Sequence, residues 1–141
     1  SSAIEYAVLA LGVHHIIVCG HSDCGAMRAV LNPQSLSKMP TVSAWLRHAE
    51  VARTVIEDNC SCGSEHESMQ LVTKENVIAQ LHHLRTHPSV ASRLAAGQLH
   101  IHGWLYDIET SQIEAYDAAS DRFLPLTAGQ PIPSATPRGR Y

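Results

Sequence analysis

The sequence predicts an α/β domain, because helical periodicity and short β-branched strands follow one another along the chain. Apolar side chains recur at helical spacing in residues 1–11, and the short β-branched run HHIIVCG follows in residues 14–20. A turn and a second helix come next, which completes a βα unit. The length of 141 residues fits one domain and is enough to bury a core without disulfide staples.

The first predicted helix ends at Gly12, a residue suited to a helix C-cap. Its apolar face, which we expect to be a surface for association, consists of Ile4, Val8 and Leu11. The strand at residues 14–20 is bounded by glycines and rich in Ile and Val, as is typical of a buried parallel strand. A tight turn at residues 21–23 then leads into a helix over residues 24–31.

The middle of the chain is predicted to be helical. Pro40 begins a helix that runs to about Asp58, and a second long helix spans residues 67–86. The side chains of the second helix that we expect to face inward recur at helical spacing: Leu71, Val77, Ile78, Leu81 and Leu84. A shorter helix begins at Pro88 and ends at Gly97.

Two strands and a tail are predicted after the helices. Residues 98–108 form a strand, residues 109–112 a turn, and residues 113–116 a returning strand. The prolines of residues 127–141 predict an extended tail that is either disordered or laid on a partner. We therefore expect one main domain over residues 1–126, followed by this Pro-rich tail.

The composition excludes several classes of protein. Ten Lys and Arg against 13 Asp and Glu give a formal charge of −3, which argues against a nucleic-acid partner. The apolar stretch of residues 7–13 is too short to span a bilayer, and we expect neither a signal peptide nor a membrane partner. Four cysteines in such a chain favour the cytoplasm and thiol or metal chemistry over disulfides.

The candidate functional motif is the turn CGHSDCG, residues 19–25, which joins the first strand to the following helix. Ligands of α/β sheets bind at the carboxyl ends of strands. His21 and Cys24 are three residues apart, so an imidazole and a thiolate can converge on one ion, and zinc accepts both. The helix N-terminus also favours the thiolate form of Cys24. From the residues alone, a structural turn with a buried Cys and a surface His remains an equal alternative.

Two ligands do not complete a zinc site, because a catalytic site needs three protein ligands and a structural site needs four. Cys19 lies two residues before His21 on the same face of the strand, and it is either a third ligand or a small buried strand residue. Cys60, Cys62 and His66 form a competing cluster, but C-x-C spacing in a polar loop suits a tetrahedral site poorly, which favours ordinary loop cysteines. 

Other chemically distinctive residues carry weaker signals. Trp45 and Trp104 are expected to pack in the core or at an interface. Asp107 and Glu109 lie beside a predicted strand end, where nothing in the pattern supports general-acid chemistry. The pair His14–His15 has no Cys or acidic neighbour at ligand spacing.

The stretch SSAIEYAVLALGVHHIIVCGHSDCGAMRAV resembles the central segment of β-class carbonic anhydrases, particularly the bacterial branch. Further similar stretches are MPTVSAWLRHAE, KENVIAQLHHLRTHPSV and LHIHGWLYDIETSQIEAYD, so the resemblance reaches from Ser1 to about Leu126. It implies a mostly parallel sheet flanked by helices, assembled as a homodimer or a higher homo-oligomer. It also implies an enzyme that reversibly hydrates CO₂ to bicarbonate and a proton.

The resemblance implies Zn²⁺ as the cofactor, with His21 and Cys24 as two of its ligands, and it argues against the other cysteines. The family's first ligand belongs to a C-x-D-x-R motif, which does not occur in this sequence. We therefore expect an N-terminally incomplete zinc domain, whose third Cys ligand and catalytic Asp–Arg pair lie upstream of Ser1.

This expectation leaves no catalytic residue assigned within the chain, and the chain alone is expected to be poorly active or inactive. CO₂ and bicarbonate are the implied substrates, and further copies of the chain are the implied partners. The alternative is a non-catalytic zinc-binding homologue that serves as an assembly subunit. 

Overall fold

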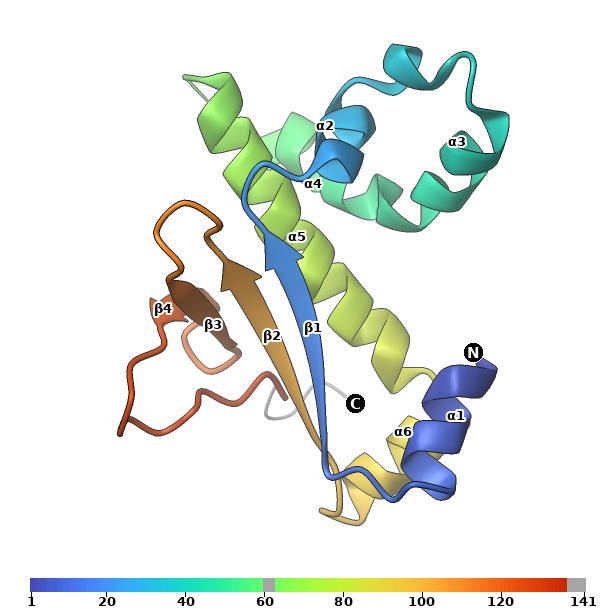
Figure 1. The fold of residues 1–141 in the computed structure, drawn as a ribbon, viewed down its shortest axis with the longest axis vertical. Helices are drawn as coiled ribbons and strands as arrows, with labels where there is room; N and C mark the ends of the chain where they lie inside the picture. The colour runs from blue at the N-terminus through green and yellow to red at the C-terminus, as the bar shows by residue number, and fades with distance from the viewer. Residues whose placement is uncertain (60–62, 137–141) are drawn as a thin grey trace.

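A computed structural model describes residues 1–59 and 63–136 of the chain. Its sheet has the order β1-β2-β3-β4 and is formed by β1 (His15–His21), β2 (His100–Tyr106), β3 (Ile113–Asp117) and β4 (Arg122–Pro125) (Figure 1). β1 and β2 are parallel, and the other two pairings are antiparallel. The α/β class is confirmed, but the described sheet is mixed rather than mostly parallel. The short connection between β2 and β3 leaves room only for an antiparallel return.

The helices of the described residues are α1 (Ser2–Leu9), α2 (Gly25–Leu31), α3 (Pro40–Leu46), α4 (Glu50–Asn59), α5 (Glu65–Arg85) and α6 (Pro88–Ala95), with short 3₁₀ turns at Pro33–Leu36 and Arg47–Ala49. The single helix predicted from Pro40 is therefore broken by the second of these turns. The tighter 3₁₀ winding changes the helical phase, so Ala49 is buried while Trp45 is 72% exposed. No helix in the described part of the chain is long and apolar enough to cross a membrane.

The long helix α5 crosses β1 and β2 at two glycines (Figure 1). A Cβ atom on Gly20 would lie 2.8 Å from Thr73 Cγ2 and 2.9 Å from Val77 Cγ2. A Cβ atom on Gly103 would lie 2.8 Å from Leu81 Cδ1 and 3.0 Å from Val77 Cγ1. Each glycine has at least one separation below 3.0 Å, shorter than the contacts of real Cβ atoms, so α5 approaches the sheet this closely only because both positions lack a side chain.

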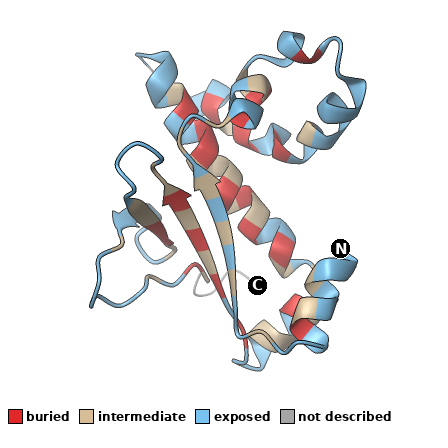
Figure 2. Ribbon diagram, viewed as in Figure 1, coloured by how far each residue is buried: buried red, intermediate tan, exposed pale blue. Residues whose placement is uncertain are grey.

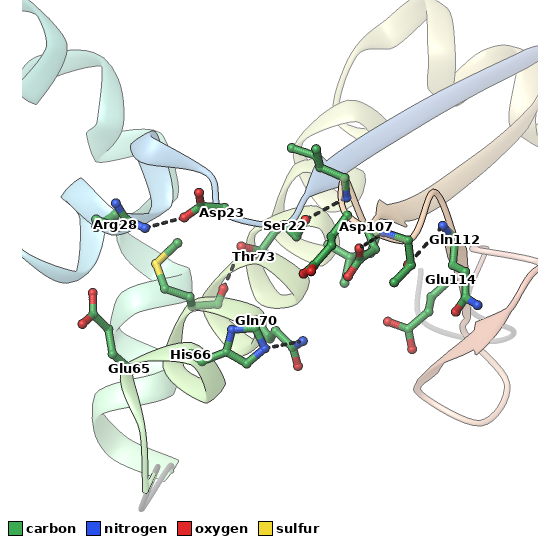
Figure 3. A pocket seen from close by; sticks show the side chains of 15 residues that line it. Ser22, Asp23, Arg28, Glu65, His66, Gln70, Thr73, Asp107, Gln112 and Glu114 are labelled. Atoms are coloured by element: carbon green, nitrogen blue, oxygen red, sulfur yellow. Dashed lines mark hydrogen bonds and ion pairs between the residues drawn. The ribbon is translucent and has the colours of Figure 1, made fainter.

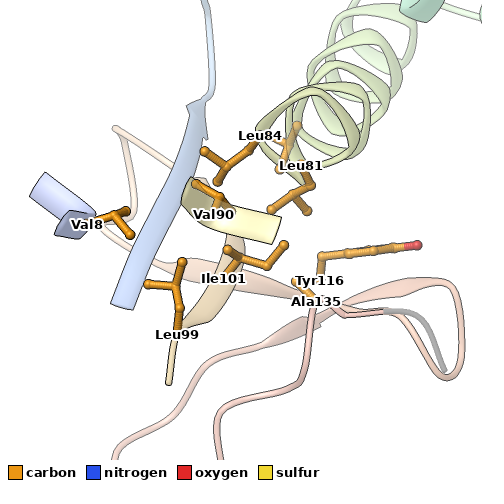
Figure 4. Packing of buried hydrophobic residues seen from close by; sticks show 9 residues of the cluster. Val8, Leu81, Leu84, Val90, Leu99, Ile101, Tyr116 and Ala135 are labelled. Carbon is orange, nitrogen blue, oxygen red and sulfur yellow. The ribbon is translucent and has the colours of Figure 1, made fainter. Parts of the chain in front are cut away.

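Two apolar clusters hold the helices in place. The larger one joins α1, α5 and α6 to the sheet and contains Val8, Val77, Leu81, Leu84, Val90, Leu99, Ile101, Tyr116 and Ala135 (Figure 4). The smaller one lies among α2, α4 and α5 and contains Met27, Val30, Ala49, Ala52, Ile56, Met69 and Val72. Leu71, which was predicted to face inward, is 37% exposed because its neighbour Val72 occupies the buried position.

Residues 127–136 contain no helix or strand and pack on their own chain. Ala135 is buried in the larger cluster, and the Ala118 amide donates a hydrogen bond to the Ser134 carbonyl oxygen at 2.9 Å. The sequence prediction also missed β4. Its four residues end at Pro125 and include Phe123, whose ring lies 5.3 Å from the Tyr116 ring.

The described helices cover one face of the β1–β2 pair. Along β1, exposed and half-buried residues alternate, and those facing away from α5 are exposed (Figure 2). Cys19 is on this open face, so its prediction as a buried strand residue is wrong. Of the predicted association surface, Val8 is buried in the chain's own core and Ile4 packs against that core, whereas Leu11, just after α1, is exposed. The exposed apolar residues on α1 itself are Tyr6 and Leu9, so the predicted surface is wrong at Ile4 and Val8.

We expect Gly103→Ala to lower the free energy of unfolding by about 1–3 kcal/mol, because the added methyl group forces Leu81 and Val77 away from the sheet. Urea denaturation of the purified protein measures this change. Gly25→Ala is the matched control, since no atom lies within 4 Å of a Cβ built there. Equal stability of the two variants would show that α5 can shift away from the sheet without lowering the free energy of unfolding.

Glu75→Gln should stabilise the protein at pH 7. Partial burial, and then the charge of Asp121, raise the pKa of the Glu75 carboxyl above its ordinary value of 4.5. When the pKa of a carboxyl is higher in the folded than in the unfolded protein, the carboxyl stabilises the fold at a pH below the unfolded pKa. This stabilisation is lost as the pH rises through the folded pKa. The gain at pH 7 should be about 0.5 kcal/mol or less, because water still screens the carboxylate. The urea midpoints of the variant and the wild-type protein at pH 4 and pH 7 test this expectation. A lower midpoint for Glu75→Gln than for the wild type at pH 7 would contradict it.

Candidate metal centre

The two predicted ligands lie on one turn between a strand and a helix. His21 is the last residue of β1, and Cys24 is the N-cap residue of α2. Tyr106, the last residue of β2, is the parallel register partner of His21. The turn therefore lies at the carboxyl ends of both parallel strands, which is where α/β sheets bind ligands.

His21 has its ring fixed by a backbone hydrogen bond. Its Nδ1 lies 2.8 Å from the carbonyl oxygen of Ser22, which can only accept. Nδ1 therefore carries the proton, and Nε2 presents its lone pair on an exposed side chain. Cys24 is a half-buried free thiol that packs against the cluster formed by α2, α4 and α5.

Ser22 and Asp23, the two residues between His21 and Cys24, each make contacts with neighbouring elements (Figure 3). The Ser22 amide donates to the Tyr106 carbonyl oxygen at 2.9 Å, and the Ser22 hydroxyl accepts from the Ile108 amide at 2.9 Å. Asp23 adopts a left-handed φ of 53°, and its carboxylate pairs with the guanidinium of Arg28 on α2. The turn is thus held from the β2–β3 loop on one side and from α2 on the other.

A pocket of about 850 Å³ lies beside the turn (Figure 3). Ser22 and Asp23 line it, but His21 and Cys24 do not. The Asp107 carboxylate, also in its lining, accepts hydrogen bonds from the loop, chiefly from the Thr110 amide, and these lower its pKa below the usual range. This pocket is therefore adjacent to the candidate centre but separate from its ligand atoms.

In the described part of the chain, no other candidate ligand completes a group of three donors with His21 and Cys24. Cys60 and Cys62 lie outside the described residues. His66 lies on α5 and lines the pocket beside the turn together with Ser22 and Asp23, and its Nε2 is 3.1 Å from Gln70 Nε2. Cys19 is a free cysteine whose Sγ donates to the Gly20 carbonyl oxygen at 3.4 Å. Although the residue as a whole is exposed, neighbouring atoms partly desolvate its sulfur, which raises the pKa of the Cys19 thiol.

Histidines also gather near the opposite ends of the parallel strands. His15 Nδ1 lies 3.0 Å from His102 Nε2, and the His15 ring stacks on His100 at a centroid distance of 5.2 Å. Burial, followed by the charges of the other two rings, lowers the pKa of His102. The parallel register brings these rings together, a contact that residue spacing alone did not reveal.

The donors at the turn fit zinc in kind, since an imidazole nitrogen and a thiol sulfur are both zinc ligands. Among residues 1–59 and 63–136, no group of three or more His, Cys, Asp or Glu is arranged to hold a metal ion. His21 and Cys24 therefore fit as part of a zinc site. The supporting role of Ser22 was not predicted, because its partner Ile108 is 86 residues away; Arg28, five residues after Asp23, offered a local charge signal.

Comparison with known proteins identifies the family. A carbonic anhydrase family model matches residues 1–113. The chain is 50% identical over 126 residues to a carbonic anhydrase of Pseudomonas aeruginosa, covering 89% of this chain and 57% of that protein. It is 48% identical over 128 residues to carbonic anhydrase 1 of Escherichia coli O157:H7, covering 91% of this chain and 58% of the relative.

Solved structures agree with these sequence matches. The β-carbonic anhydrase CcaA superposes with a TM-score of 0.86 at 41% identity, over 91% of this chain and 58% of that one. A tetrameric β-carbonic anhydrase of Sordaria macrospora gives a TM-score of 0.74 at 30% identity, over 81% of this chain and 57% of that one. The chain spans less than three fifths of the length of the curated relatives described above. Within that span, its sequence and its fold agree, and the chain belongs to the β-class carbonic anhydrase family.

Proposed function

We propose that the full-length protein reversibly hydrates CO₂ to bicarbonate and a proton, using zinc held in part by His21 and Cys24. The observation that carries this proposal is the position of both residues on one fastened turn at the carboxyl end of β1. Membership of the carbonic anhydrase family supports the reaction.

The chain's own residues hold and orient the ion. The hydrogen bond from Nδ1 to the Ser22 carbonyl oxygen keeps Nε2 of His21 free as the ligand atom and fixes the plane of the ring. Cys24 would bind as a thiolate, whose negative charge the zinc ion stabilises. When bound, zinc supplies the Lewis acidity that makes a water molecule nucleophilic near neutral pH.

We further propose that a cysteine upstream of Ser1 provides the third ligand, and that an Asp–Arg pair from the same upstream segment orients the reacting water. A catalytic zinc site needs three protein ligands, and residues 1–59 and 63–136 bring no group of three donors together, which supports this assignment. The greater length of the carbonic anhydrases that the chain matches is consistent with it.

The proposed assembly is a homodimer or a higher homo-oligomer. The open face of β1 exposes Ile17 at 45%, and α3 exposes Trp45 at 72%, so apolar surface remains for a partner to cover. A related solved structure is described as tetrameric, which supports association of this kind.

Cys24→Ser in the full-length protein should reduce zinc content from about one ion per chain to a small fraction, because a serine hydroxyl does not replace a zinc thiolate. Atomic emission on protein dialysed against metal-free buffer measures the content. Cys19→Ser is the matched control on the same strand–turn segment, and it should retain its zinc. Equal zinc loss from both variants would make Cys19 a ligand and overturn the assignment.

Stopped-flow measurements should show CO₂ hydration by the full-length protein. Cys24→Ser should lower the rate by at least about 100-fold, because loss of a ligand exceeds the ~10–100-fold cost of losing a ligand's supporting partner. Residues 1–141 alone should be similarly impaired. Full zinc occupancy without hydration by the full-length protein would instead favour the non-catalytic assembly subunit.

A further inference from the structure

We propose that Ser22 is a positioning residue, which fixes the metal-binding turn by joining it to the β2–β3 loop. This inference rests on the proposed zinc site at His21 and Cys24. It adds a residue that affects how tightly the ion is held without being one of its proposed ligands.

Ser22 uses three polar groups at once, and each has a defined partner. Its amide donates to the Tyr106 carbonyl oxygen at 2.9 Å, which extends the parallel ladder one residue beyond β1. Its hydroxyl accepts from the Ile108 amide at 2.9 Å. Its carbonyl oxygen accepts from His21 Nδ1 at 2.8 Å. The residue whose carbonyl oxygen orients the imidazole is therefore also the residue that is tied to the second strand and its loop.

The loop that receives Ser22 is itself closed. Asp107 accepts from the Thr110 amide through its carboxylate at 2.8 Å and from the Ser111 amide through its carbonyl oxygen at 2.8 Å. The Asp107 amide in turn donates to the Gln112 carbonyl oxygen at 2.9 Å. A loop with this many internal hydrogen bonds is a firm anchor, so the contact from Ile108 restrains Ser22 rather than moving with it.

Ser22 provides the turn's side-chain link across the sheet. The other intervening residue, Asp23, pairs with Arg28 on α2, so its restraint stays on the strand–helix unit that already carries both ligands. Removing the Ser22 hydroxyl leaves the Ile108 amide without its acceptor and frees the turn on the β2 side. A turn that moves more freely presents its two donors in the right geometry for less of the time.

The test compares Ser22→Ala and Ser22→Thr in the full-length zinc-loaded protein, with Ser120→Ala as the matched control. Ser120 also has its hydroxyl in one turn hydrogen bond, to Asp117 Oδ2 at 2.7 Å, but on the β3–β4 turn. Zinc transfer to a chromogenic chelator gives the dissociation rate. Cobalt substitution gives the thiolate-to-metal absorption band, which reports the geometry at Cys24.

We expect Ser22→Ala to release zinc about three- to tenfold faster, the change that corresponds to loss of one hydrogen bond. The cobalt band should shift, and exchange of the Ile108 amide proton should accelerate. Ser22→Thr keeps the hydroxyl and should restore all three readouts, while Ser120→Ala should leave them unchanged.

Unchanged zinc release and an unchanged cobalt band in Ser22→Ala would overturn the inference, even if the Ile108 amide exchanged faster. Failure of Ser22→Thr to restore zinc release would also overturn it, because the hydroxyl would then not be responsible. A failure of the proposed function would give other results than a failure of this inference. The wild-type protein would then hold no zinc, or Cys24→Ser would hold as much zinc as the wild type.

Discussion

The close contact between α5 and the two parallel strands is the constraint on which the rest of the structure depends. Val77 lies against both Gly20 and Gly103, so one helical side chain sets the distance of α5 from β1 and from β2. The larger core then closes around this contact with residues from α1, α6 and the C-terminal segment. Because Gly20 immediately precedes His21, the same contact also determines where the turn leaves the sheet.

The turn combines local and distant support. Its two ends are fixed by secondary structure, since His21 ends β1 and Cys24 precedes α2. Its middle is fixed by side chains that point to different elements, with Ser22 bonded to the β2–β3 loop and Asp23 paired with Arg28. Hydrogen bonds and an ion pair from two different elements therefore restrain the turn in the absence of any ligand.

The sequence predicted the parts of the fold that local patterns encode. Periodic apolar residues and prolines located α1, α5 and α6, and the β-branched run located β1 to within one residue of its ends. Contacts between distant segments were not predictable in this way. Neither the hydrogen bond from Ile108 to Ser22 nor the burial of Ala135 leaves a local signal, and the exposure of Cys19 depends on which face the helices cover. Of the candidate site, the sequence singled out His21 and Cys24, whose role as ligands stays a prediction, but it did not reveal the hydrogen bond that reaches Ser22 from the β2–β3 loop.

The alternation along β1 also restricts how this strand can change in length during evolution. Gly20 faces α5, and His21 faces the open side of the sheet. Deleting one residue within β1 would exchange these two sides and press an imidazole against Thr73 and Val77, where even a methyl group does not fit. Insertions and deletions should therefore be tolerated in surface loops away from the site but be excluded from β1.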